Sequence, residues 1–206
     1  MRIRTHTNPF NYFTRMESLD FSTVLPHFSG TFDFEVGFGR GLFIRHYATM
    51  FPERSIVGIE VRKNPVELLK IKLKKEAIKN AYVIHGTAEI CLADMIPDGS
   101  LNRVFIFHPD PWFKKRHHKR RVINPKFLVQ LRPKLAPNAT LYVSTDVAPL
   151  WDSMEETILD SGYFNTIEDP VFWETCYLTN WQAFSKRDQR TTYFGTYQLR
   201  HEENSH

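Results

Sequence analysis

Five short apolar segments recur along the chain, separated by longer stretches in which apolar residues fall at helical spacing. The apolar segments cover residues 31–36, 55–60, 81–85, 103–107 and 140–144. Strands that alternate with helices favour a parallel sheet with helices on both of its faces. The sequence therefore predicts an α/β fold with a doubly wound, mostly parallel sheet.

The remaining elements are predicted from capping residues and from alternation. Asn64-Pro65 and Asn124-Pro125 each indicate a helix start, with a capping side chain followed by proline at the first helical position. A third helix is predicted to open at Pro149 and to end at Ser161-Gly162. Apolar and polar residues alternate from Tyr193 to Leu199, which predicts a C-terminal strand antiparallel to the others.

Length and periodicity predict the domain organisation. The chain has 206 residues, which is ordinary for one domain. Residues 1–25 show no strong periodicity, so we expect a mobile N-terminal arm followed by a single domain over residues 26–206.

Several classes of protein are disfavoured. No uninterrupted apolar run exceeds four residues, whereas a membrane-spanning helix needs ~20. The first 21 residues lack the apolar stretch of a secretory signal. The two cysteines, Cys91 and Cys176, are too few for a disulfide framework or a cysteine-rich zinc site. We expect a cytoplasmic protein with no membrane association and no metal.

The positive charge is concentrated in one part of the chain. The net charge is +4, but residues 111–145 contain no acidic residue and nine basic ones, so the rest of the chain carries a net charge of −5. The nine are Lys114, Lys115, Arg116, Lys119, Arg120, Arg121, Lys126, Arg132 and Lys134. A basic segment of this kind on a mildly acidic body predicts a polyanionic partner.

A glycine-rich turn follows the first predicted strand and opens a helix. Gly37, Gly39 and Gly41 would let the backbone turn tightly and approach a bound nucleotide closely. Glu35 precedes them in a strand that should be buried, where a carboxylate needs a cationic partner such as a ligand ammonium. Glu60 ends the next strand, where a carboxylate can accept hydrogen bonds from both hydroxyls of a ribose.

This combination resembles the class I S-adenosylmethionine-dependent methyltransferases, whose cofactor has a ribose and an ammonium to be held but no phosphate. A nicotinamide-dependent enzyme is the alternative for the glycine turn, but it would prefer the spacing Gly-x-Gly-x-x-Gly. The resemblance implies a Rossmann-like methyltransferase sheet.

A second motif follows the fourth predicted strand, at the end of the sheet where ligands bind in such folds. Asp110 lies between Pro109 and Pro111, which fix the backbone on both sides of the carboxylate. Trp112 offers a face on which a base could stack. The basic segment begins directly afterwards, so polyanion binding and chemistry are expected to share one rim.

The second motif makes the resemblance specific, since it is similar to the signature of the bacterial tRNA (guanine-N7)-methyltransferases. That family has Pro-Asp-Pro-Trp followed by Lys-Lys-x-His-x-Lys-Arg-Arg, which residues 109–121 match. Thr145-Asp146 matches the Thr-Asp pair at the end of the family's fifth strand. Residues 185–190 and Gly195 resemble its Thr-Lys-(aromatic)-Glu-x-Arg segment and following glycine.

The resemblance implies transfer of a methyl group from S-adenosylmethionine to N7 of a guanosine in the variable region of tRNA. The implied catalytic residue is Asp110. The implied cofactor-binding residues are Glu35, Gly37, Gly39, Gly41, Glu60, Thr87 and Asp110. The implied substrate-binding residues are Lys114, Asp146, Ser185, Lys186, Arg187 and Asp188, and those expected on the RNA backbone are Lys115, Arg116, Lys119, Arg120 and Arg121. A monomer or a homodimer is expected.

Several positions depart from the family pattern. His108 stands where a Phe is usual, and Thr87 stands where Asp or Asn would hold the adenine amino group, a role that Glu89 could take over. Ser185 stands for Thr, Arg187 for an aromatic residue and Asp188 for Glu. These departures leave open a cofactor-binding, RNA-binding paralogue with weak or no catalysis. A methyltransferase acting on an amino group of adenine or cytosine would need a second proline in place of Trp112.

Overall fold

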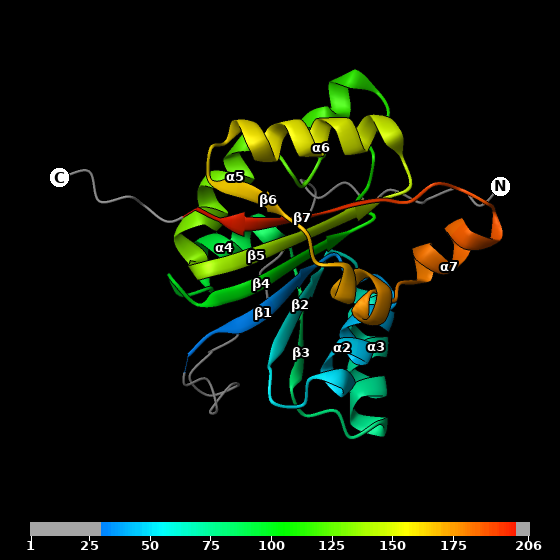
Figure 1. The fold of residues 1–206 in the computed structure, drawn as a ribbon. Coiled ribbons are helices and arrows are strands. Elements are labelled where there is room, and N and C mark those ends of the chain that lie inside the picture. Colours follow the sequence, from blue (N-terminus) through cyan, green and yellow to red (C-terminus); the bar gives the residue numbers. More distant parts are fainter. Residues whose placement is uncertain (1–29, 201–206) are drawn as a thin grey trace.

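The computed structural model describes residues 30–200, which form one seven-stranded sheet with the order β3-β2-β1-β4-β5-β7-β6 (Figure 1). The strands are β1 (Phe32–Val36), β2 (Ile56–Glu60), β3 (Ala81–His85), β4 (Leu101–Phe107), β5 (Leu135–Thr145), β6 (Phe164–Ile167) and β7 (Tyr193–Leu199). Strands β1 to β5 pair in parallel, while β7 is antiparallel to both β5 and β6. The predicted doubly wound, mostly parallel sheet with an antiparallel C-terminal strand is confirmed.

Helices follow most of the parallel strands. They are α2 (Leu42–Met50), α3 (Lys63–Lys75), α4 (Ala88–Asp94), α5 (Pro125–Leu131), α6 (Ala148–Asp160) and α7 (Asn180–Arg187). Two short 3₁₀ helices, η2 (Lys115–Arg120) and η3 (Arg132–Lys134), and one π-helical turn, η4 (Phe172–Cys176), complete the described elements. None of these helices is long and apolar enough to cross a membrane. The expected N-terminal arm over residues 1–25 lies outside the described residues.

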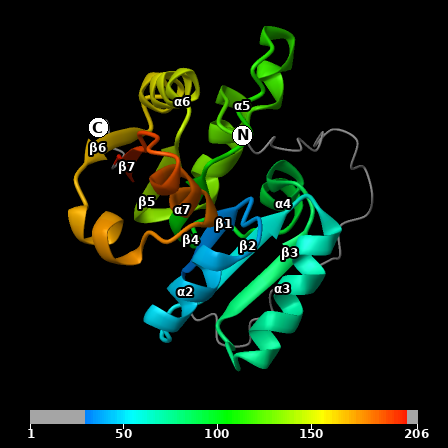
Figure 2. The ribbon, with the colours of Figure 1, turned by 90° about the vertical axis from the view of Figure 1, so that its right-hand side faces the viewer.

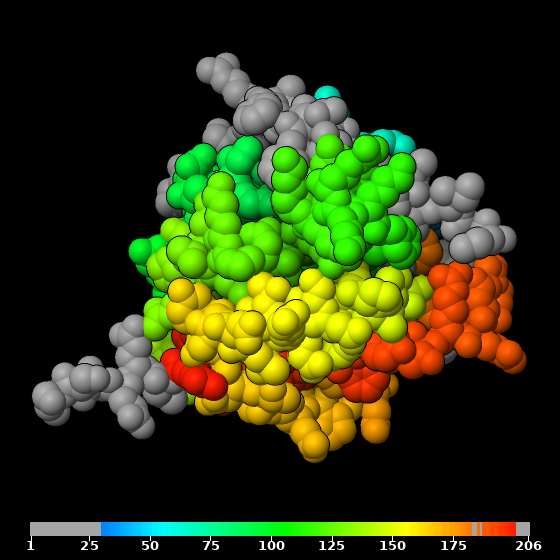
Figure 3. Space-filling model, turned by 90° about the horizontal axis from the view of Figure 1, so that it is seen from above, coloured from blue at the N-terminus to red at the C-terminus, as the bar shows by residue number. Residues whose placement is uncertain are grey.

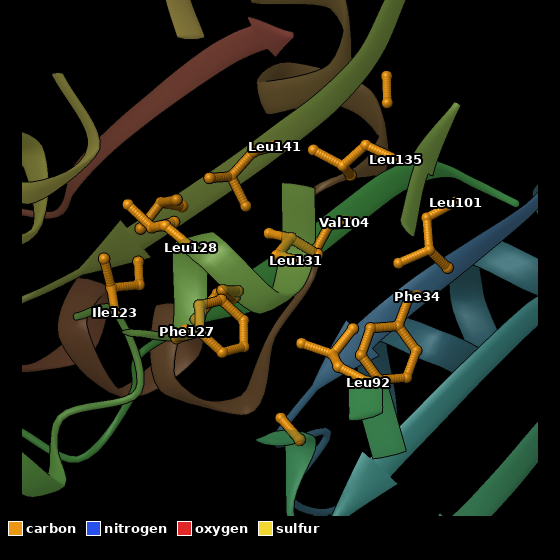
Figure 4. Packing of buried hydrophobic residues seen from close by; sticks show 14 of the residues in the cluster. Phe34, Leu92, Leu101, Val104, Ile123, Phe127, Leu128, Leu131, Leu135 and Leu141 are labelled. Carbon is orange, nitrogen blue, oxygen red and sulfur yellow. The ribbon is translucent and has the colours of Figure 1, made fainter. Parts of the chain in front are cut away.

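The sheet separates two apolar cores, one on each face. On one face α4, α5 and α6 pack against the strands through side chains such as Leu92, Phe127 and Leu131, which surround Phe34 and Val104 (Figure 4). On the other face α2, α3 and η4 enclose a second, aromatic-rich cluster. Figure 2 shows the two helix layers on opposite sides of the strands. In Figure 3, viewed from above, α6 lies beside the green region that includes α5, and α7 lies at the right-hand edge.

The helix starts were predicted with mixed success. The Asn124 side chain accepts a hydrogen bond from the backbone N–H of Phe127, so this capping residue is confirmed. At the earlier site the prediction was wrong, because α3 begins at Lys63 with Arg62 as its N-terminal cap. Asn64 lies inside the helix, so it is not the residue that caps the N-terminus of α3.

Strand β6 was not predicted from the sequence. It has four residues, two of them exposed, which is too short for an alternation pattern to stand out. The fourth and fifth strands also extend further toward their amino ends than expected, to Leu101 and Leu135.

Candidate functional site

A cavity of about 340 Å³ opens at the carboxyl ends of β1, β2 and β4. Its lining comes from the glycine turn, the ends of β2 and β3, the motif after β4 and the start of α7. The predicted cofactor-binding residues that line it are Glu35, Gly37, Gly39, Glu60, Thr87 and Asp110. Residues that are up to 75 positions apart in the sequence were thus correctly predicted to lie close together.

The glycine turn needs its glycines for backbone geometry. Gly37, Gly39 and Gly41 all have positive φ, at 76°, 58° and 71°. Gly41 does not line the cavity, and a Cβ there would lie 2.4 Å from the Leu69 side chain of α3. Gly41 therefore permits the packing of α2 on α3 rather than contact with a ligand, and we remove it from the predicted cofactor-binding residues.

Glu35 is a buried carboxyl group with an unsatisfied oxygen. Its side chain is 3% exposed, and Oε2 has no hydrogen-bond partner among the described residues. Burial, reinforced by the nearby charge of Glu60, raises the pKa of Glu35 to about 8. A cation entering the cavity would ionise this group and stabilise it, so the position fits the predicted ammonium site.

Glu60 lies beside it at the end of β2 and is fully hydrogen-bonded. Its carboxylate accepts from the backbone N–H groups of Gly39 and Arg62, at 3.0 Å each. The Arg62 guanidinium adds two further bonds, from Nε at 2.9 Å and from Nη2 at 3.1 Å. Because a carboxylate has about four acceptor positions, hydroxyls of a ligand would take the places of the Arg62 side chain, which is 45% exposed.

Thr87 and Glu89 lie at the beginning of α4. Thr87 is buried and precedes α4, but its side chain makes no capping hydrogen bond to the helix. Both residues line the cavity. A hydroxyl and a carboxylate are thus available there for a polar group of the ligand.

Asp110 lines the cavity between two residues of strained backbone. His108 and Trp112 have φ values of 47° and 43°, in the left-handed region that bulky side chains rarely adopt. The buried Arg121 guanidinium donates from Nε to the Pro111 carbonyl at 3.0 Å. The strand end and this arginine thus hold the loop that presents Asp110.

The surroundings of Trp112 and Arg121 bear on two predictions within the motif. Trp112 lines the cavity, but it is only 8% exposed and the Arg120 guanidinium lies 5.0 Å from its ring, so its stacking on a base stays a prediction. Arg121 is equally buried, and its bonds to Pro111 and to the His118 ring, at 3.1 Å from Nη2, occupy the guanidinium. We therefore withdraw Arg121 from the predicted RNA contacts.

The basic segment is dispersed over the surface rather than forming one patch. Lys114, Lys115, Arg116 and Lys119 are exposed on and beside η2, next to the cavity. Arg120 faces the cavity itself. The last two members, Arg132 and Lys134, lie within η3, where Arg132 stacks over Tyr163 and Lys134 pairs with Asp98.

The C-terminal segment is joined to the sheet through Asp146. The Asp146 carboxylate is fully buried and its Oδ2 accepts from Arg190 Nη1 at 2.8 Å and from Ser185 Oγ at 3.3 Å. Arg190 also donates to Asp188 at 2.6 Å, and Arg187 donates to the same carboxylate. Of Lys186 the structure describes only the backbone, so its predicted role stays a prediction.

Sequence reasoning missed part of the cavity wall. Thr179, Asn180 and Trp181, at the start of α7, line the same space as the motif after β4. Nothing in their spacing signals this, because the contact depends on how the chain returns between β6 and β7. Among the described residues no group of three or more His, Cys, Asp or Glu side chains could hold a metal ion.

Comparisons with known proteins agree with this geometry. Residues 31–199 match the model of a family described as "Putative methyltransferase". A tRNA (guanine-N(7)-)-methyltransferase of Paracoccus denitrificans is 34% identical over 166 residues, which are 81% of this chain and 71% of that protein. The protein of the same name from Prochlorococcus marinus (strain AS9601) is also 34% identical, over 82% of this chain and 84% of its own length.

A third relative of that name, from Alkalilimnicola ehrlichii, is 42% identical over 61% of this chain, but the match spans only 52% of its length. Among solved structures, the 16S rRNA methyltransferase KamB matches with a TM-score of 0.63 at 19% identity, covering 89% of this chain and 94% of its own. A SAM-dependent methyltransferase from Aquifex aeolicus gives a TM-score of 0.56 at 17% identity, over 87% and 89% of the two chains. These two likenesses establish the fold.

Proposed function

The chain belongs to the tRNA (guanine-N(7)-)-methyltransferase family, and we propose that it transfers a methyl group from S-adenosylmethionine to N7 of a guanosine in the variable region of tRNA. The single observation that carries the proposal is the convergence of Glu35, Glu60 and Asp110 on one cavity whose rim bears exposed lysines and arginines. We also propose that the enzyme works in the cytoplasm.

The cavity residues fit the cofactor. S-adenosylmethionine, when bound, supplies an electrophilic methyl group on a sulfonium. The unsatisfied Oε2 of Glu35 is suited to the ammonium of its amino-acid part. Glu60 is suited to the ribose hydroxyls once Arg62 yields, and Thr87 with Glu89 is suited to the adenine amino group.

The reaction depends on alignment of the methyl donor and acceptor more than on proton transfer. Guanine N7 is a neutral lone pair at physiological pH, so no general base has to act before the attack. Holding the acceptor and the methyl group about 3–3.5 Å apart is the main task of the site. Asp110 contributes a carboxylate that stabilises the positive charge arriving on the purine and accepts hydrogen bonds from its N–H groups.

The exposed cations beside the cavity define how RNA approaches. In an A-form duplex N7 faces a major groove too deep and narrow for side chains, so the target guanosine must lie in a loop, a junction or an extruded position. Lys114, Lys115, Arg116 and Lys119 are proposed to contact the substrate and its phosphates. If four phosphate contacts form, the affinity for tRNA falls steeply with salt, by roughly a factor of 50 to 150 between 50 and 200 mM.

One assay tests the function directly. The protein is incubated with cofactor carrying a labelled methyl group and with tRNA transcripts that have guanosine or 7-deazaguanosine at the target position. Transfer to guanosine alone is expected. Transfer to both transcripts would exclude N7 as the acceptor, and binding of cofactor and tRNA without transfer would identify a non-catalytic paralogue.

A further inference from the structure

His108 is buried beside the cavity at a position where the resembled family usually has phenylalanine. Its ring is fully enclosed, and the residue adopts a left-handed backbone conformation with φ 47°. Its backbone N–H donates to the Ser144 carbonyl at 2.7 Å, which ties the start of the Asp110 loop to the end of β5. A strained, buried, polar residue persists only where its surroundings stabilise it.

Both ring nitrogens of His108 face polar groups from other elements. Nδ1 lies 3.5 Å from Oδ1 of Asp146, an electrostatic contact longer than an ordinary hydrogen bond, and Nε2 lies 2.7 Å from the hydroxyl of Tyr177. The same hydroxyl lies 2.8 Å from Ser144 Oγ. The imidazole therefore bridges the end of β5 and the segment that follows η4.

The charges of these partners favour one tautomer of the ring. Arg190 pairs with Asp146, and a carboxylate can only accept, so a proton on Nδ1 is the arrangement that the contact with Asp146 favours. Nε2 is then an acceptor, and Tyr177 donates to it. Burial raises the pKa of Tyr177 to about 12, so this hydroxyl keeps its proton at neutral pH.

Asp146 links His108 to the C-terminal segment that is proposed to bind the substrate. One of its oxygens faces His108, while the other accepts from Ser185 and Arg190. Because the carboxylate is fully buried, it reaches the RNA only through these partners. The orientation of Asp146 therefore bears on the position of residues 185–190, which follow the cavity-lining residues Thr179, Asn180 and Trp181 along the chain.

We propose that His108 is a positioning residue that orients the Asp146 carboxylate and, through Arg190, the segment of residues 185–190 that faces the RNA. This inference rests on the proposed function for its substrate but adds a residue-level coupling between the Asp110 loop and that segment. A phenylalanine side chain at position 108 would fill the same space, but it has no polar atom with which to orient Asp146.

Variants of His108 separate positioning from packing. In His108→Asn the amide nitrogen takes the place of Nδ1, and in His108→Gln the amide occupies the place of Nε2. His108→Phe keeps the volume and removes both polar groups. We expect His108→Phe and His108→Gln to raise KM for tRNA about tenfold, with kcat and the Kd of S-adenosylmethionine within about twofold of the original protein. His108→Asn should restore KM to within about threefold.

Tyr142→Phe is the matched control. It removes the hydroxyl of another buried tyrosine, on β5, which donates to Asp169 Oδ2 at 2.7 Å; no hydrogen bond found among the described residues joins it to His108 or Asp146. Its KM for tRNA should not change, whatever it does to Tm. A purely structural role would overturn the proposal, and it would show as a lower Tm for His108→Phe with KM unchanged, or as equal KM for the Asn, Gln and Phe variants.

A second measurement needs no substrate and separates this inference from the proposed function. Nitrogen-15 NMR of the full-length protein should show the His108 ring as the Nδ1–H tautomer, with the Nε2 resonance shifted in Tyr177→Phe. The opposite tautomer would refute the coupling to Asp146 even if methyl transfer is normal. Absence of methyl transfer by the original protein, with the Nδ1–H tautomer present, would instead refute the function and leave the coupling intact.

Discussion

Two acidic residues two positions apart on β1 are both buried, yet their surroundings are opposite. Asp33, toward the amino end of the strand, accepts two hydrogen bonds from Arg54, both at 2.8 Å, and one from Tyr47 at 2.7 Å. Glu35, toward the carboxyl end, leaves Oε2 without a partner in the described structure. A buried acid whose hydrogen bonds are all made stabilises the fold, whereas one with an unsatisfied oxygen lowers stability until a ligand binds to it.

The comparison is sharpest when each acid is replaced by its isosteric amide. Asp33→Asn should lower the free energy of unfolding by about 3 kcal/mol, because the buried charge that holds Arg54 and Tyr47 is removed. Chemical denaturation at pH 7 measures this loss. The cofactor affinity of the folded variant should stay unchanged, and a large loss of affinity would contradict the assignment of Asp33 to the fold alone.

Glu35→Gln should act in the opposite direction on stability. The pKa of Glu35 is about 8 in the folded protein against an ordinary value of 4.5. Below pH 4.5 both folded and unfolded chains hold the proton. Between pH 4.5 and 8 the unfolded chain ionises while the folded chain does not, so stability falls as pH rises through this window.

The amide has no proton to lose, so its advantage should grow from zero near pH 4.5 to roughly 3 kcal/mol at pH 7. Denaturation curves at several pH values measure this trend. The same variant should lose affinity for S-adenosylmethionine, because an amide does not neutralise the ammonium. Equal pH dependence in the two proteins would mean that Glu35 is already ionised in the fold.

Asp110 extends the comparison from binding to catalysis. Asp110→Ala should lower kcat about 100-fold, equivalent to about 2.7 kcal/mol of transition-state stabilisation. The Kd of S-adenosylmethionine should change far less, since Glu35 and Glu60 remain in place. Single-turnover kinetics with saturating cofactor measures the effect, and normal turnover would remove Asp110 from the mechanism.

The same contrast explains what was predictable from the sequence. Glu35, Glu60 and Asp110 were located because each ends or follows a parallel strand, and such ends converge at one edge of the sheet. The role of Arg121 was misjudged, because a run of basic residues does not show which of its side chains point into solvent and which point inward. One turn of 3₁₀ helix places Lys119 in solvent, Arg120 in the cavity and Arg121 in the interior.

The contribution of α7 to the cavity was not predictable either. Trp181 meets Asp110 at one cavity only because β7 returns antiparallel between β5 and β6, a long-range consequence of topology. The buried state of Asp146 has the same origin, since Arg190 and Ser185 cover it from 39 or more positions away in the sequence. Local patterns located the strand ends, but not what packs over them.

The smallest predicted effect concerns Arg62. This residue pairs with Glu60 as Arg54 pairs with Asp33. The Arg54 side chain is 25% exposed, whereas that of Arg62 is 45% exposed, so the Glu60 pair is the more easily exchanged. An exposed pair of this kind contributes about 1 kcal/mol or less. Arg62→Ala should therefore leave stability nearly unchanged and tighten the binding of S-adenosylmethionine by a few-fold, because the ribose no longer competes with the guanidinium. Isothermal titration of both proteins checks this; weaker binding in the variant would show that Arg62 is itself a ligand contact, and the exchange model at Glu60 would fail.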